Sequence, residues 1–115
     1  PVILVDFHAE AASEKLAMAF YLDGRVSAVA GSHTHIQTAD ERILPGGTGY
    51  ITDLGMCGSF NSVLGVKPEL AVQRMRTHLP VRFENAVTDH RMSGILLEID
   101  EKTGKTSRIE RINIE

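Results

Sequence analysis

A strand, a helix and a second strand are predicted within the first stretch of about 30 residues. The apolar run Pro1–Val5 predicts a strand that is buried on both faces. Apolar residues then recur at helical spacing, at Ala12, Leu16, Ala19 and Phe20. Asp23-Gly24 is a stop signal for this helix, and residues 26–30 predict the next strand. Such a unit requires two parallel strands joined by a right-handed crossover.

The remaining sequence predicts hairpins and a second helix. Arg42–Leu44 and Tyr50–Thr52 read as short strands around a glycine-rich turn, and residues 55–65 read as a loop. Pro68 suits the first turn of a helix. Alternating apolar residues near the end predict a final hairpin, around Lys102–Lys105. Together these elements predict an α/β fold with a mixed sheet.

Length and the first strand bear on domain organisation. At 115 residues the chain is at most one domain, or one portion of a larger one. A strand buried from residue 1 onward suggests that the chain starts inside a fold. The alternative is a processed terminus that begins on a strand.

Composition excludes several classes of protein. Hydrophobic residues make up 43% and charged residues 23%, which is ordinary for a globular protein. The net charge of -3 gives no general attraction to nucleic acid or anionic membranes, so an anionic substrate would need a local charge such as a metal. The sequence has no signal peptide and no apolar run of membrane-spanning length. The single cysteine, Cys57, excludes an intrachain disulfide and suits a cytoplasmic location.

Three histidines follow the two strands of the first unit. His8 comes just after the first strand, and His33 and His35 come just after the second. Ligands bind at the carboxyl edge of α/β sheets, and an extended backbone would send both imidazoles of the H-x-H pair to one side. Gly31 would allow a tight turn or a close approach to a ligand. Imidazole is the commonest neutral metal ligand, so this set predicts a metal site.

Two chemistries remain open for this histidine set. All three imidazoles could bind one Zn ion and leave a position for water, which gives a mononuclear hydrolase. Alternatively, they could share two metals, about 3.5–4 Å apart, with carboxylates that lie elsewhere. Asp6, Glu10 and Asp53 could orient an imidazole, but helix-start and turn roles are favoured for them.

The other histidines, His78 and His90, have no partner pattern. An isolated histidine in a loop or turn is more often a hydrogen-bonded or solvated side chain than a ligand. We therefore expect neither residue to contribute to the metal site.

Four segments of the sequence resemble the YmdB-like family of bacterial calcineurin-like metallophosphoesterases. The G-x-H-x-H element at Gly31–His35 is common to many metallophosphoesterases, whereas the first and last of these segments are more particular. The segments are Asp6–Lys15, Asp23–Val26, Gly31–His35 and Tyr50–Met56.

The resemblance implies a four-layer α/β/β/α sandwich with mixed sheets and two divalent metal ions, Fe or Mn, with Zn as a further option. It implies phosphodiesterase activity on small phosphodiesters such as 2′,3′-cyclic nucleotides. His8 and His33 would bind one ion and His35 the other. The family's other ligands, and a histidine that protonates the leaving oxygen, come from an N-terminal half. Cys57 stands where relatives usually have threonine, with no clear consequence.

We therefore interpret residues 1–115 as the C-terminal portion of a single metallophosphoesterase domain from a cytoplasmic enzyme. The alternatives are a mononuclear histidine-ligated hydrolase and an inactive metal-binding or regulatory module. The chain alone is expected to be inactive, because three neutral imidazoles cannot balance about four positive charges from two divalent ions. Neither DNA nor a membrane is an expected partner, and a homo-oligomer is compatible with the sequence.

Overall fold

The computed structural model describes all of residues 1–115 and divides them into two compact units. Unit 1 contains Pro1–Met56 and Ser93–Ile112, and unit 2 contains Cys57–Met92 and Asn113–Glu115. The helices are α1 (Ala12–Leu22) and α2 (Pro68–Thr77). The strands are β1 (Leu4–His8), β2 (Ala28–Ser32), β3 (Arg42–Ile43), β4 (Gly49–Ile51), β5 (Cys57–Ser59), β6 (His90–Ile99) and β7 (Thr106–Ile114).

The predicted strand–helix–strand unit is confirmed. β1 and β2 are neighbouring parallel strands, paired in register from Leu4 with Ala28 to His8 with Ser32, and α1 connects them. The sheet order is β1-β2-β4-β3, with β4 parallel to β2 and β3 antiparallel to β4. The α/β class and the mixed sheet are therefore confirmed, together with the glycine-turn hairpin of β3 and β4.

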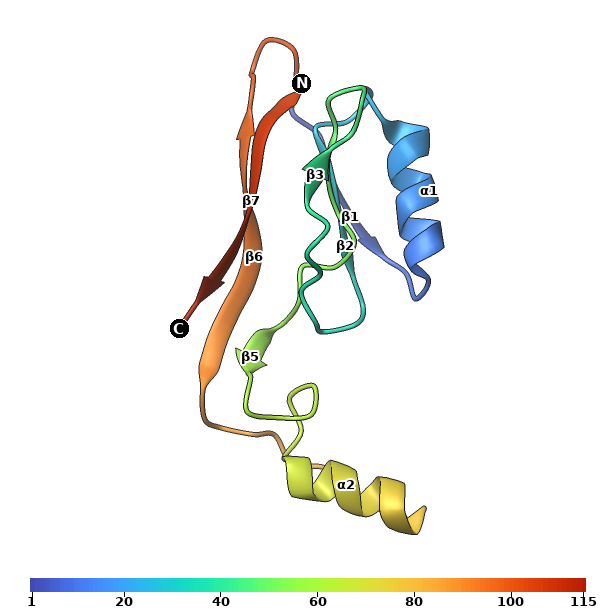
Figure 1. Cartoon of the computed structure of the whole chain (residues 1–115), viewed down its shortest axis with the longest axis vertical. Coiled ribbons are helices and arrows are strands. Elements are labelled where there is room, and N and C mark those ends of the chain that lie inside the picture. The colour runs from blue at the N-terminus through green and yellow to red at the C-terminus, as the bar shows by residue number, and fades with distance from the viewer. The chain divides into compact units, whose positions relative to one another are not determined.

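Unit 1 has three layers (Figure 1). Helix α1 covers one face of the sheet, and the hairpin of β6 and β7 lies over the other face. The hydroxyl of Thr106 on β7 donates to the carbonyl of Ser27 next to β2, at 2.6 Å. Gln37 donates to the carbonyls of Gly94 and Ile112, at 2.9 and 3.2 Å. These bonds join the hairpin to the sheet within the unit.

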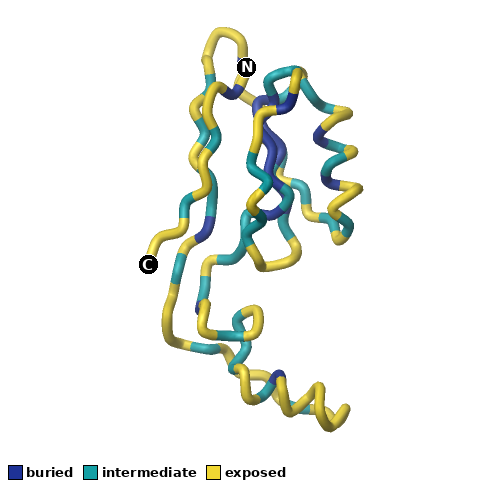
Figure 2. The backbone as a smooth tube through the Cα atoms, in the orientation of Figure 1, coloured by how far each residue is buried: buried dark blue, intermediate teal, exposed yellow.

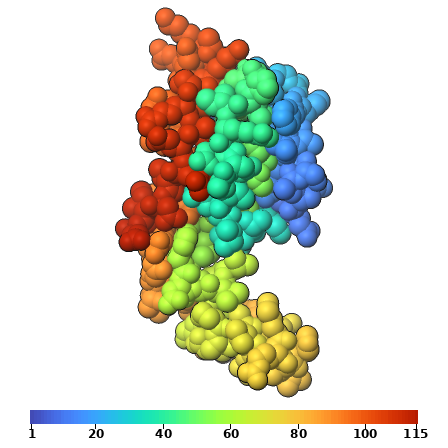
Figure 3. All heavy atoms as spheres, in the orientation of Figure 1, coloured from blue at the N-terminus to red at the C-terminus, as the bar shows by residue number.

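The core of unit 1 lies between α1 and the sheet, and Figure 2 shows buried residues gathered along the strands next to α1. Its buried members are Ala19, Val29, Leu44 and Tyr50, with Val5 and Leu16 among the residues packed against them. In the space-filling view, α1 and residues 35–50 form one continuous surface (Figure 3). Phe20, predicted to be on the buried face of the helix, is 51% exposed, whereas Lys15 is buried. The buried face of α1 is therefore rotated away from Phe20 and toward Lys15, relative to the prediction.

Two strand predictions were wrong. β1 is an edge strand rather than a strand buried on both faces, and Leu4 is 62% exposed. Only Val5 and Phe7 of β1 pack on the core, because side chains alternate between the faces of a strand. Residues 55–65 were predicted to be a loop, but they contain β5, which pairs antiparallel with the start of β6. A three-residue strand is too short to show an alternating pattern in the sequence.

Unit 2 contains the second predicted helix. Pro68 lies in the first turn of α2, as expected, and the helix ends at His78 in a left-handed conformation. Apart from Ala71, which is buried, the helix is largely exposed, with Val72 and Met75 among its exposed apolar residues. No helix of the structure is both long enough and apolar enough to cross a lipid bilayer.

Candidate functional site

The candidate site lies at the carboxyl edge of the parallel strands β1, β2 and β4. His8 is the last residue of β1 and pairs in register with Ser32, the last residue of β2. His33 follows directly, and Asp53 follows the end of β4. In α/β proteins, ligands bind at this edge of the sheet.

Two of the three predicted ligands meet there. Nε2 of His8 lies 3.2 Å from Nδ1 of His33. The two rings stand nearly edge to face, with centroids 5.1 Å apart. Both imidazoles are exposed, so both are accessible from solvent. The predicted convergence is thus observed for His8 and His33.

His35 forms no hydrogen bond or ring contact with this pair, and no three His, Cys, Asp or Glu side chains of the chain form a group that could hold a metal ion. The extended backbone predicted for the H-x-H pair was wrong. The H-x-H backbone is bent rather than extended, with φ of 128° at His33 and 66° at His35. Positive φ costs a non-glycine residue about 1–3 kcal/mol, and such residues cluster at functional sites.

The histidine pair has a polar neighbour that the sequence reasoning missed. The hydroxyl of Ser32 lies 3.0 Å from Nδ1 of His8. If this hydroxyl accepts from Nδ1–H, the lone pair of His8 is on Nε2, the nitrogen that faces His33. The only sequence signal was position, because Ser32 is directly across from His8 in two parallel strands.

Asp53 does not contact an imidazole, although an orienting role was one alternative for it. Its side chain is buried, and Oδ2 accepts from the backbone N–H of Thr34 at 2.8 Å and from Nζ of Lys15 at 3.3 Å. Oδ1 accepts from the N–H of Gly55 at 2.9 Å. Burial alone would raise the pKa of Asp53, but these donors outweigh it and hold the pKa below its usual value.

Neither of the other candidate carboxylates, Asp6 and Glu10, hydrogen-bonds to the histidine pair. Asp6 is on the exposed face of β1, and Glu10 is exposed ahead of α1. Ala11 rather than Glu10 precedes the helix as its N-cap, and its N–H donates to Glu14 at 3.3 Å. Neither predicted helix-start role is therefore present.

Gly31 permits the close approach of another backbone segment, at Thr52, rather than of a ligand. A Cβ placed on Gly31 would lie 1.8 Å from the carbonyl oxygen of Thr52 and 2.8 Å from Cδ of Lys15. The chain beside Asp53 and the stem of Lys15 thus pass directly over Gly31. The glycine allows β2, β4 and α1 to meet at the site.

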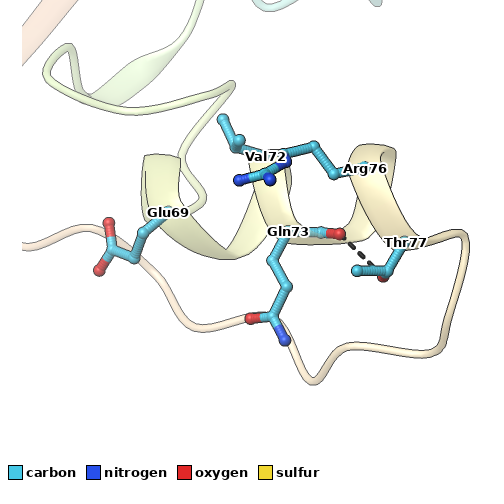
Figure 4. A pocket seen from close by; sticks show the side chains of 5 residues that line it. All are labelled: Glu69, Val72, Gln73, Arg76 and Thr77. Atoms are coloured by element: carbon cyan, nitrogen blue, oxygen red, sulfur yellow. Dashed lines mark hydrogen bonds between the residues drawn. The ribbon is translucent and has the colours of Figure 1, made fainter.

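Unit 2 has a surface depression without comparable chemistry. Figure 4 shows it on α2, where the side chains of Glu69 and Arg76 point in different directions. The hydroxyl of Thr77 donates to the carbonyl of Gln73 at 2.9 Å, so it is already paired. The remaining lining residue is Val72. The histidine edge therefore remains the candidate functional site.

Substitution of His78 or His90 should leave the metal content of the full-length protein unchanged. His78 ends α2 with φ 56°, and His90 begins β6 opposite Ser59. His78→Gly is preferable to alanine because glycine adopts positive φ without strain. The measurement is elemental analysis of His78→Gly and His90→Ala after dialysis, and a large loss of metal from either variant would show that the site is wrongly assigned.

Comparison with known proteins identifies the chain's relatives. The family described as YmdB-like protein matches residues 1–112. The chain is 55% identical, over 99% of its length, to a 2′,3′-cyclic-nucleotide 2′-phosphodiesterase of Bacillus subtilis (strain 168) and spans 43% of that protein.

Solved structures agree with the sequence comparison. A hypothetical protein from Thermus thermophilus superposes with a TM-score of 0.90 at 42% identity, over 97% of this chain and 44% of that one. A novel phosphatase from Mycoplasma pneumoniae superposes with a TM-score of 0.89 at 42% identity, over 96% of this chain and 40% of that one. This chain thus spans less than half the length of these relatives, and it belongs to the YmdB-like protein family.

Proposed function

We propose that this chain is part of a metal-dependent phosphodiesterase that hydrolyses small phosphodiesters, such as 2′,3′-cyclic nucleotides, by a two-metal mechanism. The observation that carries the proposal is the 3.2 Å separation of His8 Nε2 and His33 Nδ1 at the strand edge. The substrate class is supported by the 55% identity of the chain to the 2′,3′-cyclic-nucleotide 2′-phosphodiesterase of Bacillus subtilis. The net charge of -3 gives no general attraction for a phosphate anion, which favours a locally bound cation.

The donor atoms fit a metal ion. Two nitrogens bound side by side to one ion, in tetrahedral or octahedral geometry, lie about 3.0–3.4 Å apart. The separation of His8 and His33 falls in this range. Neutral imidazoles suit Fe, Mn and Zn, and the resemblance favours Fe or Mn.

In this proposal His8 and His33 bind one ion and His35 binds the second. The structure brings together two imidazoles rather than three, which supports this division over a single Zn with three histidine ligands. The ions would supply Lewis-acid polarisation of the phosphoryl oxygens and activation of water. Ser32 would keep the lone pair of His8 on the nitrogen that faces the ion.

We further propose that residues 1–115 form the C-terminal portion of a single domain. The fourth layer of the sandwich and the remaining ligands would then come from residues outside this chain. The open edge of β1 and its exposed Leu4 support this proposal. An apolar hollow in unit 1, lined by residues such as Ala28, Ile95 and Leu97, offers further surface for packing. The single cysteine agrees with a cytoplasmic location.

The test compares the full-length protein with residues 1–115 alone, each supplied with Mn or Fe. We expect the full-length protein to hydrolyse a bis-aryl phosphate and a 2′,3′-cyclic nucleotide, and the isolated chain to be inactive. In this proposal, the carboxylates that balance two ions lie outside residues 1–115. So does the acid for the leaving group, which contributes about 10²–10⁴-fold in rate. Comparable turnover by the isolated chain, abolished by His33→Ala, would favour the mononuclear hydrolase instead. An inactive full-length protein that retains metal would favour a regulatory module.

A further inference from the structure

The loop from His33 to His35 has an unfavourable backbone that other residues must maintain. His33 and His35 have positive φ, and residues 33–36 are exposed to solvent. Within the loop, the hydroxyl of Thr34 donates to the carbonyl of Ile36 at 3.0 Å and accepts its N–H at 3.1 Å. These local bonds are exposed, so they compete directly with water.

One bond ties the middle of this loop to the buried part of the unit. The N–H of Thr34, between the two histidines, donates to Oδ2 of Asp53 at 2.8 Å. Asp53 is 0% exposed, and its own N–H donates to the hydroxyl of Thr38 at 2.9 Å. The carboxylate is therefore fixed in place, and it fixes the amide that separates the two candidate ligands.

A buried cation accompanies this carboxylate. Lys15 extends from α1 past Gly31, and its Nζ lies 3.3 Å from Oδ2 of Asp53. The side chains of both residues are only 1% exposed. Buried ion pairs contribute little net stability compared with apolar residues of similar volume. A role in setting a particular conformation explains this pair better than a role in stability alone.

We propose that Asp53, buried against Lys15, is a positioning residue that holds His33 and His35 in the conformation needed to bind metal. This inference rests on the proposed function for its metal-binding consequence. It assigns Asp53 neither to the metal nor to the substrate. Asp53 acts through the backbone N–H of Thr34. The ammonium group of Lys15 compensates the negative charge of the buried Asp53 carboxylate.

The main test variant is Asp53→Asn in the full-length protein. An amide has a single acceptor oxygen, whereas Asp53 accepts from Thr34 with one oxygen and from Gly55 with the other. The variant must therefore turn an NH₂ group toward one of these N–H donors. We expect the peptide containing Thr34 to lose protection from amide hydrogen exchange and affinity for Mn to fall roughly 10–100-fold.

Val29→Ala is the control for a general loss of stability. Val29 belongs to β2 and is buried in the core of unit 1, but it is not among the residues that bond to the loop. Both variants are compared by urea unfolding, Mn affinity from calorimetry and the d–d spectrum of bound Co. Val29→Ala should lower the urea midpoint and keep the wild-type affinity and spectrum. Asp53→Asn should change the spectrum as well as the affinity.

The outcomes separate this inference from the proposed function. Wild-type exchange protection at Thr34 in Asp53→Asn would overturn the inference, whatever the metal result. A parallel loss of Mn affinity in Asp53→Asn and Val29→Ala, in proportion to stability, would also overturn it, because a structural role then suffices. Absence of metal from the wild-type protein would instead overturn the proposed function.

Discussion

Replacing His33 with alanine is expected to remove bound metal and phosphodiesterase activity from the full-length protein together. Nδ1 of His33 faces Nε2 of His8 at 3.2 Å, so the variant leaves one imidazole where the proposal needs two. Loss of a residue that merely orients a ligand typically costs about 10–100-fold in affinity or activity, and loss of the ligand itself should cost more. The measurements are elemental analysis and initial rates with a 2′,3′-cyclic nucleotide.

Ser32→Ala provides a graded comparison at the same site. It retains both imidazoles but removes the hydroxyl that lies 3.0 Å from Nδ1 of His8. The expected loss is therefore smaller, about 10–100-fold. Ser107→Ala is the matched control, because this exposed hydroxyl on β7 donates a hydrogen bond to the carbonyl of Glu98, at 3.2 Å, and lies outside the site. A His33→Ala variant with normal metal content and rate would contradict the assignment.

Gly31→Ala is expected to produce the largest loss of stability among single methyl additions at the site. The new Cβ would lie 1.8 Å from the carbonyl oxygen of Thr52, so the backbone next to Asp53 has to move. Overpacking of this kind typically costs about 1–3 kcal/mol, occasionally more. Because Asp53 holds the histidine loop, activity should fall as well. Urea unfolding of the full-length protein measures the free energy.

Gly94→Ala is the control for this substitution. Gly94 also lies in a strand, but its added Cβ would meet only side-chain atoms of Ile112, at 3.5 and 3.6 Å. These are ordinary contacts, so the expected change is within about 0.5 kcal/mol. If Gly31→Ala were as stable as Gly94→Ala, the close approach of Thr52 would not be a real constraint.

Local periodicity accounts for most of the fold that the sequence predicted. The α1 helix, the β3–β4 hairpin, the start of α2 at Pro68 and the β6–β7 hairpin each follow from spacing or turn residues. The exposure of β1 could not be predicted in this way, because the sequence of a strand does not indicate whether a neighbouring strand covers its edge. Leu4 is apolar and nevertheless 62% exposed here.

Only the part of the site that depends on strand topology could be predicted from the sequence. Placing His8 and His33 at one sheet edge required only two parallel strands, which the strand–helix–strand pattern supplied. The bend at His33 and His35 depends on Asp53, which is distant in sequence, so no local pattern indicated it. One signal was overlooked. Lys15 shares helical spacing with Ala12 and Ala19, and a lysine on a buried face requires an acidic partner.

The most direct test of the central claim is a crystal structure of the full-length protein grown with Mn, with anomalous diffraction recorded at the Mn edge. We expect one ion within about 0.2 Å of a 2.1 Å bond length from both His8 Nε2 and His33 Nδ1. A second ion should be bound by His35, about 3.5–4 Å from the first. Anomalous peaks that lie away from His8 and His33, or one ion held by all three imidazoles, would contradict the account.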